Sequence, residues 1–206
     1  MRFLDLEALN TTPLKRWPFD HLVVPKFVSA EHAGDLGRGF PRIRRAGSFP
    51  LHTLDYGYAF RRLVQEMRSR AFEAAVEEKF DIDLSRVATM FTARGRCRLE
   101  DGKIHSDSKS KIITVLLYLN DLDWRHEGGR LRILKSGHDI DDAVEEVAPN
   151  FGTLLVFRRS DRSWHGHLPF EGPRRILQMN WVASKRVAAW EQLRHTLSAW
   201  GKQPAA

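Results

Sequence analysis

The chain has 206 residues, of which 42% are hydrophobic and 29% charged. This composition is typical of a folded globular protein and not of a disordered or fibrous one. The length suits a single domain with one core. The longest apolar run, residues 112–119, is interrupted by Thr114 and is far shorter than the roughly 20 residues that cross a bilayer. We therefore expect no membrane span.

The N-terminus and the cysteine content bear on the cellular compartment. Asp5 and Glu7 stand where a signal peptide would have a basic region followed by an apolar stretch. The chain has one cysteine, Cys97, which excludes an intramolecular disulfide and fits a reducing environment. We therefore expect a cytoplasmic protein.

The formal net charge is +7, which raises the question of an acidic partner. The basic residues are scattered along the chain and form no long tract, so we do not expect nucleic acid as the partner. The tightest cluster, Arg42, Arg44 and Arg45, lies in a loop bounded by proline and glycine. It is either solvated there or borders an acidic substrate. The sequence does not indicate the oligomeric state.

The first part of the chain predicts a strand and several helices. Residues 21–24 are a short strand, and Ser29 is the N-cap of a helix with Glu31 and His32 in its first turn. Residues 39–50 are a loop. Residues 56–80 form one or two amphipathic helices, because their apolar residues recur at steps of three and four. These apolar residues are Phe60, Leu63, Val64, Met67, Phe72 and Val76.

After Asp83 the pattern changes to short apolar segments separated by turn residues, which is typical of a jelly roll or barrel. Strands are expected near residues 88–94, 102–107, 112–119, 130–134, 144–148, 153–158, 163–169 and 174–183. Such a set predicts a double-stranded β-helix, in a mainly β (α+β) fold with flanking helices. Within one domain of residues 1–206, residues 1–83 would support the catalytic core at 84–183. The segment 184–206 would add a C-terminal helix at 184–200.

The most informative motif is His105-Ser106-Asp107, which is followed by His165 near the end of a later apolar strand. On an extended strand His105 and Asp107 leave the same face and can share one metal ion. Two histidines and one carboxylate are the ligands of mononuclear non-haem iron oxygenases. The HxD pair alone is a weak signal, so its context must carry the interpretation.

That context is an ordered series of segments. The segment at residues 114–121 follows the HSD motif, then come Gly128-Gly129-Arg130, Ser163-Trp164-His165, and the segment from Arg175 to Trp181. This order resembles the prolyl-4-hydroxylase-like branch of the iron(II)/2-oxoglutarate-dependent dioxygenases, over about residues 88–183. The resemblance implies an enzyme with Fe(II), the cosubstrate 2-oxoglutarate and O2, with ascorbate as an optional addition.

Carried over to this sequence, the resemblance makes His105, Asp107 and His165 the iron ligands and the catalytic set. It also implies a cation for the far carboxylate of 2-oxoglutarate, a role that suits the planar fork of arginine. In the family this arginine lies six residues before an aromatic residue on the same strand face. Counting back from Trp181 selects Arg175, with Arg174 as the alternative.

Three further residues have softer assignments. Tyr118 matches a tyrosine that donates a hydrogen bond to the same carboxylate in related enzymes, although it could equally be a core residue bonded to backbone. Thr114 lies on the same strand face and is assigned to cosubstrate binding with it. His167 would share the strand face of His165, and we expect it near the metal ligands or facing the substrate, with the ligand role as its alternative.

The implied reaction hydroxylates an unactivated C–H bond while 2-oxoglutarate is converted to succinate and CO2. The substrate could be a small molecule, a saccharide or lipid, or a peptidyl proline, since fold-level resemblance says little about specificity. A basic rim suggests that it is anionic. The rim comprises Arg94, Arg96, Arg98, Arg158, Arg159 and Arg162.

Other interpretations stay open. The triad could consist of ordinary core or surface polar residues, in a barrel that has lost iron binding. A cupin-like metal isomerase would share the barrel but leave Arg175 unexplained. Nucleic-acid demethylation of the AlkB kind is disfavoured, because the chain lacks that group's RxNxxxR run after the cosubstrate arginine. A noncatalytic basic module that binds nucleic acid or another anion is the alternative from a different functional class.

Overall fold

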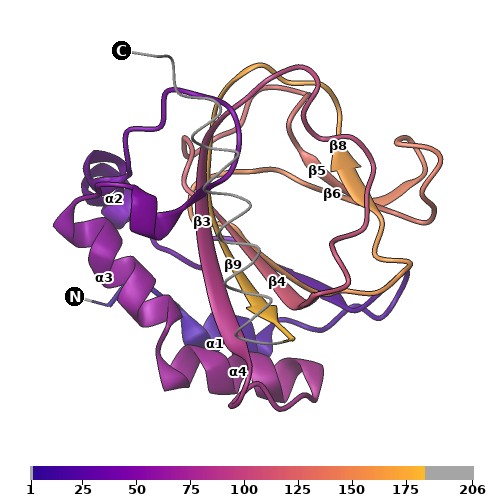
Figure 1. Cartoon of the computed structure of the whole chain (residues 1–206), viewed down its shortest axis with the longest axis horizontal. Helices are drawn as coiled ribbons and strands as arrows, with labels where there is room; N and C mark the ends of the chain where they lie inside the picture. The colour runs from indigo at the N-terminus through magenta and orange to yellow at the C-terminus, as the bar shows by residue number, and fades with distance from the viewer. Residues whose placement is uncertain (1, 184–206) are drawn as a thin grey trace.

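A computed structural model of the protein describes residues 2–183. Two antiparallel sheets form its centre, one with strand order β1-β7-β4-β9-β3-β2 and the other with order β6-β5-β8. The strands are β1 (His21–Val24), β2 (Phe49–Pro50), β3 (Ala88–Cys97), β4 (Lys111–Tyr118), β5 (Leu131–Leu134), β6 (Ala143–Val147), β7 (Leu154–Arg158), β8 (His165–His167) and β9 (Gly172–Val182). Figure 1 shows the helices on one side of the large sheet and the small sheet on the other. The expected mainly β class with flanking helices is confirmed.

The helical elements precede the long strands. They are α1 (Leu6–Thr11), η1 (Ala30–His32), α2 (Ala33–Gly39), η2 (Leu51–Thr53), α3 (Tyr58–Met67) and α4 (Arg70–Phe80). Ser29 caps η1 as predicted, with its hydroxyl accepting a hydrogen bond from the Glu31 amide. The predicted helical stretch at 56–80 is two helices because Ser69 starts a new one, and its hydroxyl accepts from the Phe72 amide at 3.2 Å.

Side-chain alternation divides the large sheet into two faces. The outward face packs against the helices, and the inward face packs against the small sheet. On β4 the outward residues are Ile113, Val115 and Leu117, and the inward ones are Thr114, Leu116 and Tyr118. On β9 the outward residues are Leu177, Met179 and Trp181, and the inward ones are Arg174, Ile176, Gln178 and Asn180. Only inward residues can reach the space between the sheets.

The outward core connects the helices to the sheet through aromatic packing. Phe72 of α4 stacks on Trp181 of β9 with ring centroids 6.2 Å apart, and both side chains are fully buried. Trp181 is therefore a packing residue of the helix-covered face. This placement matters for the site, because it fixes which residues of β9 share the outward face.

Two predicted segments differ in the structure. Residues 102–107 do not form a strand, and only His105 makes a single bridge, with His165. The predicted loop at 39–50 ends in the short edge strand β2, which pairs with β3. The predicted C-terminal helix at 184–200 lies outside the described residues. Among the residues described, no helix has both the length and the apolarity to cross a membrane.

The Phe72 contact yields a stability prediction. We expect Phe72→Ala to lower the free energy of unfolding by about 3–5 kcal/mol, because it leaves a cavity beside Trp181. Leu122→Ala is the control, since Leu122 is 60% exposed, and it should change stability by less than about 0.5 kcal/mol. Urea denaturation followed by tryptophan fluorescence measures both, and equal small effects would contradict the packing described.

Candidate metal centre

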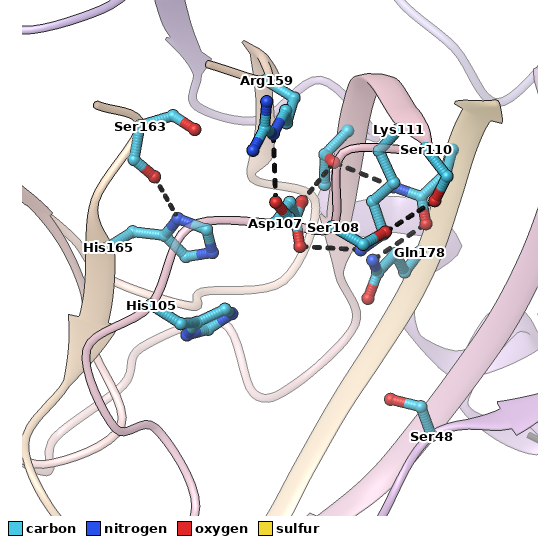
Figure 2. Close-up of polar contacts among 12 residues, drawn as sticks. Ser48, His105, Asp107, Ser108, Ser110, Lys111, Arg159, Ser163, His165 and Gln178 are labelled. Carbon is cyan, nitrogen blue, oxygen red and sulfur yellow. Dashed lines mark hydrogen bonds and ion pairs between the residues drawn. The ribbon is translucent and has the colours of Figure 1, made fainter. Parts of the chain in front are cut away.

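Three side chains meet in the space between the two sheets. One ligand atom each of His105, Asp107 and His165 lies within 4.8 Å of the others. The backbones of the two histidines face each other directly, each donating its N–H to the other's carbonyl at 3.0 Å. Figure 2 shows the three side chains turned toward one another. The predicted ligand set is thus brought together, although without the predicted strand at 102–107.

The two imidazoles are oriented for metal binding by backbone carbonyls. Nδ1 of His105 lies 2.8 Å from the Lys103 carbonyl oxygen, and Nδ1 of His165 lies 2.9 Å from that of Ser163. A carbonyl can only accept, so each Nδ1 carries a proton and Nε2 is the ring nitrogen left for a metal ion. Burial, together with neighbouring His105, lowers the pKa of His165 to about 4. The ring is therefore neutral at pH 7, as a metal ligand must be.

Asp107 is held in its ionised form. Its two carboxylate oxygens accept hydrogen bonds from Lys111 Nζ at 2.7 Å and from the Thr114 hydroxyl at 2.5 Å. Burial is the largest single effect and would raise the pKa of Asp107, but the charge and hydrogen bond of Lys111, the charge of His165 and the Thr114 hydrogen bond together outweigh it and lower this pKa to about 2. Arg159 fixes the backbone of this segment, since its Nε donates to the Asp107 carbonyl at 3.1 Å.

A chain of side-chain amides supports the carboxylate from β9. Gln178 donates to the Asn180 side-chain oxygen at 3.0 Å, and Asn180 donates to the Thr114 hydroxyl at 2.9 Å. Thr114 then directs its own proton to Asp107. Sequence reasoning missed Asn180 and Lys111. Their signals were a buried amide in an apolar strand and a cation four residues after the metal carboxylate.

The metal ligands line a cavity of about 230 Å³. This is below the roughly 300–1,000 Å³ of sites that enclose drug-sized ligands, so it suits a small group or one end of a larger one. Inward residues of β4 and β9 form one wall, and β8 and the segment around Gly102 form another. Arg94 and Ser48 also contribute to the lining.

Arg174 brings a cation into this cavity. It is only 3% exposed, and its Nε donates to the Gly129 carbonyl at 2.7 Å. Its Nη2 has no hydrogen-bond partner, and neither has the fully buried hydroxyl of Tyr118, whose ring lies 5.4 Å from the Arg174 guanidinium carbon. Buried polar groups are normally paired. Two orphaned donors side by side therefore fit an anionic group with at least two acceptor oxygens, such as a carboxylate.

The prediction for Arg175 is wrong in its placement. Arg175 is exposed on the outward face, where its guanidinium lies over the Phe40 ring at 5.7 Å and not in the cavity. The reason is the alternation of β9: Trp181 faces the helices, so a residue six positions earlier on the same strand also faces outward. The alternative, Arg174, is the arginine that reaches the cavity.

The remaining predicted residues lie close to the metal ligands but differ in their contacts. Thr114 contacts Asp107 directly and Tyr118 packs beside Arg174, so their predicted part in cosubstrate binding stays a prediction. His167 lines the cavity and is not one of the three clustered ligands, in agreement with the expectation for it. Burial, followed by the charge of Arg174, lowers the pKa of His167 to about 4.

The predicted basic rim is dispersed in the structure. Of its six arginines, all of which lie in the part of the chain that the structure describes, only Arg94 lines the metal cavity. Arg94 pairs with Asp101 at 3.4 Å. Arg158 points to the Phe80 carbonyl and to Asp20, and Arg98 pairs with Asp101 at the surface. The rim therefore does not form one anionic-substrate surface around the metal centre.

Comparisons with known proteins agree with this geometry. Residues 96–183 match the family model of the 2OG-Fe(II) oxygenase superfamily. No curated protein matches the chain. A prolyl-4-hydroxylase from Pseudomonas putida is similar in structure, with a TM-score of 0.58, 17% identity, and coverage of 86% of this chain and 90% of that one.

Two other solved structures have the same fold. HygX from Streptomyces hygroscopicus, solved with nickel and 2-oxoglutarate bound, has a TM-score of 0.56 and 14% identity, covering 87% of this chain and 86% of that one. The viral collagen prolyl hydroxylase vCPH from Paramecium Bursaria Chlorella virus-1 has a TM-score of 0.54 and 13% identity, covering 80% and 96%. At these identities the likeness shows a shared fold.

The double-stranded β-helix and its His-Asp-His cluster define a non-haem metal oxygenase type of site. Together with the family match, they place residues 96–183 in the 2OG-Fe(II) oxygenase superfamily. The substrate is not decided by this membership.

The depressed pKa of His167 predicts a pH dependence of stability. Its pKa falls from 6.5 to about 4 on folding, so between these pH values the unfolded chain binds a proton that the folded chain does not. Stability of the metal-free protein therefore decreases as the pH falls through this window. In His167→Gln the decrease should be shallower by up to about 1.4 kcal/mol per pH unit. Urea unfolding across the window checks this, and parallel profiles would contradict it.

Proposed function

We propose that the protein is an Fe(II)- and 2-oxoglutarate-dependent dioxygenase that hydroxylates an unactivated C–H bond, with release of succinate and CO2. The observation that carries this proposal is the pairing of the His105, Asp107 and His165 cluster with a buried arginine that lacks a partner in the same cavity. A metal site alone would fit many functions. A metal site beside the unpaired, buried guanidinium of Arg174 suits a ligand that binds the metal at one end and presents a carboxylate to Arg174 at the other.

The three clustered residues would hold the iron. Each imidazole directs its Nδ1 to a backbone carbonyl and leaves Nε2 for the metal, and Asp107 is ionised. Lys111 and Thr114 keep the carboxylate in place, which limits the geometry that it can offer to a metal. Three protein ligands leave other coordination positions for the cosubstrate and O2.

Arg174 and Tyr118 would bind the far carboxylate of 2-oxoglutarate. A guanidinium forms charge-assisted hydrogen bonds to carboxylates, and the orphaned Nη2 and phenol hydroxyl supply two donors. The Gly129 carbonyl holds the guanidinium through its Nε. Burial raises the pKa of Tyr118 while Arg174 opposes this rise, so the phenol stays protonated and able to donate.

The cavity walls would orient the reactants and exclude water. Leu116, Phe157 and Ile176 give the cavity an apolar lining next to the ligands. Bound iron with 2-oxoglutarate supplies the oxidising chemistry, so the protein needs no side-chain general base. The residues of this chain then have three tasks, which are to bind the cosubstrate, to position the target C–H bond and to keep competing reactants out.

The fold does not choose among substrates. The similar structures include prolyl hydroxylases as well as HygX, with comparable TM-scores. A small molecule, a saccharide or lipid, and a peptidyl proline all remain candidates. A noncatalytic binding module is disfavoured because its function would not require the ordered support of Asp107 by Lys111, Thr114 and Asn180. A cytoplasmic location stays a prediction from the sequence.

An anaerobic titration tests the cofactor chemistry. The purified protein should develop a visible metal-to-ligand charge-transfer band only when both Fe(II) and 2-oxoglutarate are added. Asp107→Ala should lose the band, because one of the three clustered ligands is removed. Circular dichroism of the variant controls for folding. If the folded wild-type protein shows no band, the dioxygenase proposal is wrong.

A pair of variants tests which arginine binds the cosubstrate. Arg174→Gln should weaken 2-oxoglutarate binding at least about 30-fold, since truncating one partner of a buried charge pair costs about 2 kcal/mol or more. Arg175→Gln should leave the affinity unchanged, because Arg175 lies outside the cavity. Titration of the Mn(II)-loaded protein with 2-oxoglutarate by calorimetry measures both. The reverse order of effects would restore the assignment of Arg175.

A further inference from the structure

A second feature of the molecule is a strongly basic groove on the outward face of the large sheet. Its charged lining consists of five arginines and no acidic residue, and we call it the arginine groove. The five are Arg38, Arg42, Arg44, Arg96 and Arg175. Phe40, Pro41, Ile43 and Pro173 give the groove an apolar component. It includes two of the three arginines in the tightest basic cluster of the sequence.

Most of this positive charge is not compensated within the protein. Arg38 pairs with Asp35, but in the described part of the chain no ion pair involves Arg42, Arg44, Arg96 or Arg175. All four of these residues are exposed. Five guanidinium groups along one groove repel one another and focus a positive potential there. A ligand with several closely spaced oxyanions would relieve that repulsion.

The groove is separate from the metal cavity but is built on the same two strands. Arg94 pairs with Ile176 and faces inward, whereas Arg96 pairs with Pro173 beyond a register shift. Such a bulge re-aims the following side chain, and Arg96 accordingly lines the outward groove. Arg174 and Arg175 are neighbours on β9, so alternation turns Arg174 inward to the metal cavity and Arg175 outward to the groove. Gly37 and Arg38 of α2 also line the groove, and Figure 1 shows α2 on the helix-covered side of β3.

The loop after α2 links the groove to the metal cavity. Its first residues, Phe40 to Arg44, line the groove, and Ser48 further along lines the cavity. Ile43 anchors the loop on β3, because a Cβ at Gly95 would come within 2.7 Å of the Ile43 Cβ. A chain that is bound in the groove would therefore lie next to the wall of the metal cavity.

We propose that the arginine groove docks a polypeptide segment rich in oxyanions, either aspartate and glutamate carboxylates or phosphorylated side chains. Clusters of arginine recognise such segments through paired, charge-assisted hydrogen bonds. The apolar component of the groove offers contacts for the aliphatic parts of a peptide. The inference rests on groove geometry and charge alone, so it does not depend on the proposed dioxygenase activity.

A nucleic acid fits the groove less well. Proteins that bind single strands combine positive charge with exposed aromatic faces on which bases stack. The aromatic residue of this groove, Phe40, is only 8% exposed, and the guanidinium of Arg175 lies over its ring. The groove thus offers charge without a stacking platform, which favours the peptide.

Fluorescence anisotropy with the full chain tests the proposal. The probes are labelled hexaglutamate, a Ser-Gly repeat peptide with phosphorylated serines, its unphosphorylated form, and an oligo-dT of matching charge. The groove variant carries Arg42→Glu and Arg44→Glu. The matched control carries Arg86→Glu and Arg125→Glu, two exposed arginines outside the groove with the same change in net charge. Circular dichroism and thermal melting verify that both are folded.

The expected result is binding of at least one oxyanion-rich peptide at physiological ionic strength, without binding of the unphosphorylated repeat. The groove variant should weaken this binding at least about tenfold, and the control by less than about twofold. The preferred peptide identifies carboxylate or phosphate as the source of the oxyanions. Failure of both acidic peptides to bind, equal losses in the two variants, or tighter binding of oligo-dT would each overturn the proposal.

Discussion

The candidate site depends on the two backbone hydrogen bonds that join His105 to His165. In the segment before β4 this is the one β-bridge, and a further backbone hydrogen bond, from the His167 N–H to the Gly102 carbonyl at 2.9 Å, also holds the segment against β8. The bridge ties the segment that carries Asp107 to β8 of the small sheet. Because paired residues in an antiparallel bridge lie directly opposite each other, two histidines at these positions converge.

Bringing a carboxylate into this buried position has an electrostatic cost, and the structure offsets it locally. Lys111 supplies the opposite charge, and Thr114 and Asn180 complete the hydrogen bonding from the inward face of the large sheet. These residues come from the two central strands β4 and β9, and β9 also carries Arg174, the arginine proposed to bind the cosubstrate. The same inward face therefore supports the Asp107 carboxylate and carries Arg174, so the candidate metal ligands and the proposed anion-binding group lie within one small cavity.

Much of the architecture was predictable from local patterns. The alternating strands, the amphipathic helical stretch at 56–80 and the ligand types depend on periodicity and on the chemistry of side chains, which the sequence states directly. The sequence did not show which of Arg174 and Arg175 faces the cavity, although alternation placed them on opposite faces of the strand. It required knowing that Trp181 packs against Phe72 of a helix. A buried tryptophan suits either side of a sheet, so the sequence alone could not orient the strand.

The sequence by itself determined the fold class, the three clustered ligands and the excess of positive charge. The tertiary structure decided where that charge acts: it buried Arg174 next to the metal ligands, dispersed the expected rim, and gathered Arg96 and Arg175 with distant loop arginines in a separate groove. The physical reason is the distance along the chain over which each property is set. Periodicity and ligand chemistry are properties of neighbouring residues, whereas the face that a strand presents is set by what packs on it from elsewhere in the chain.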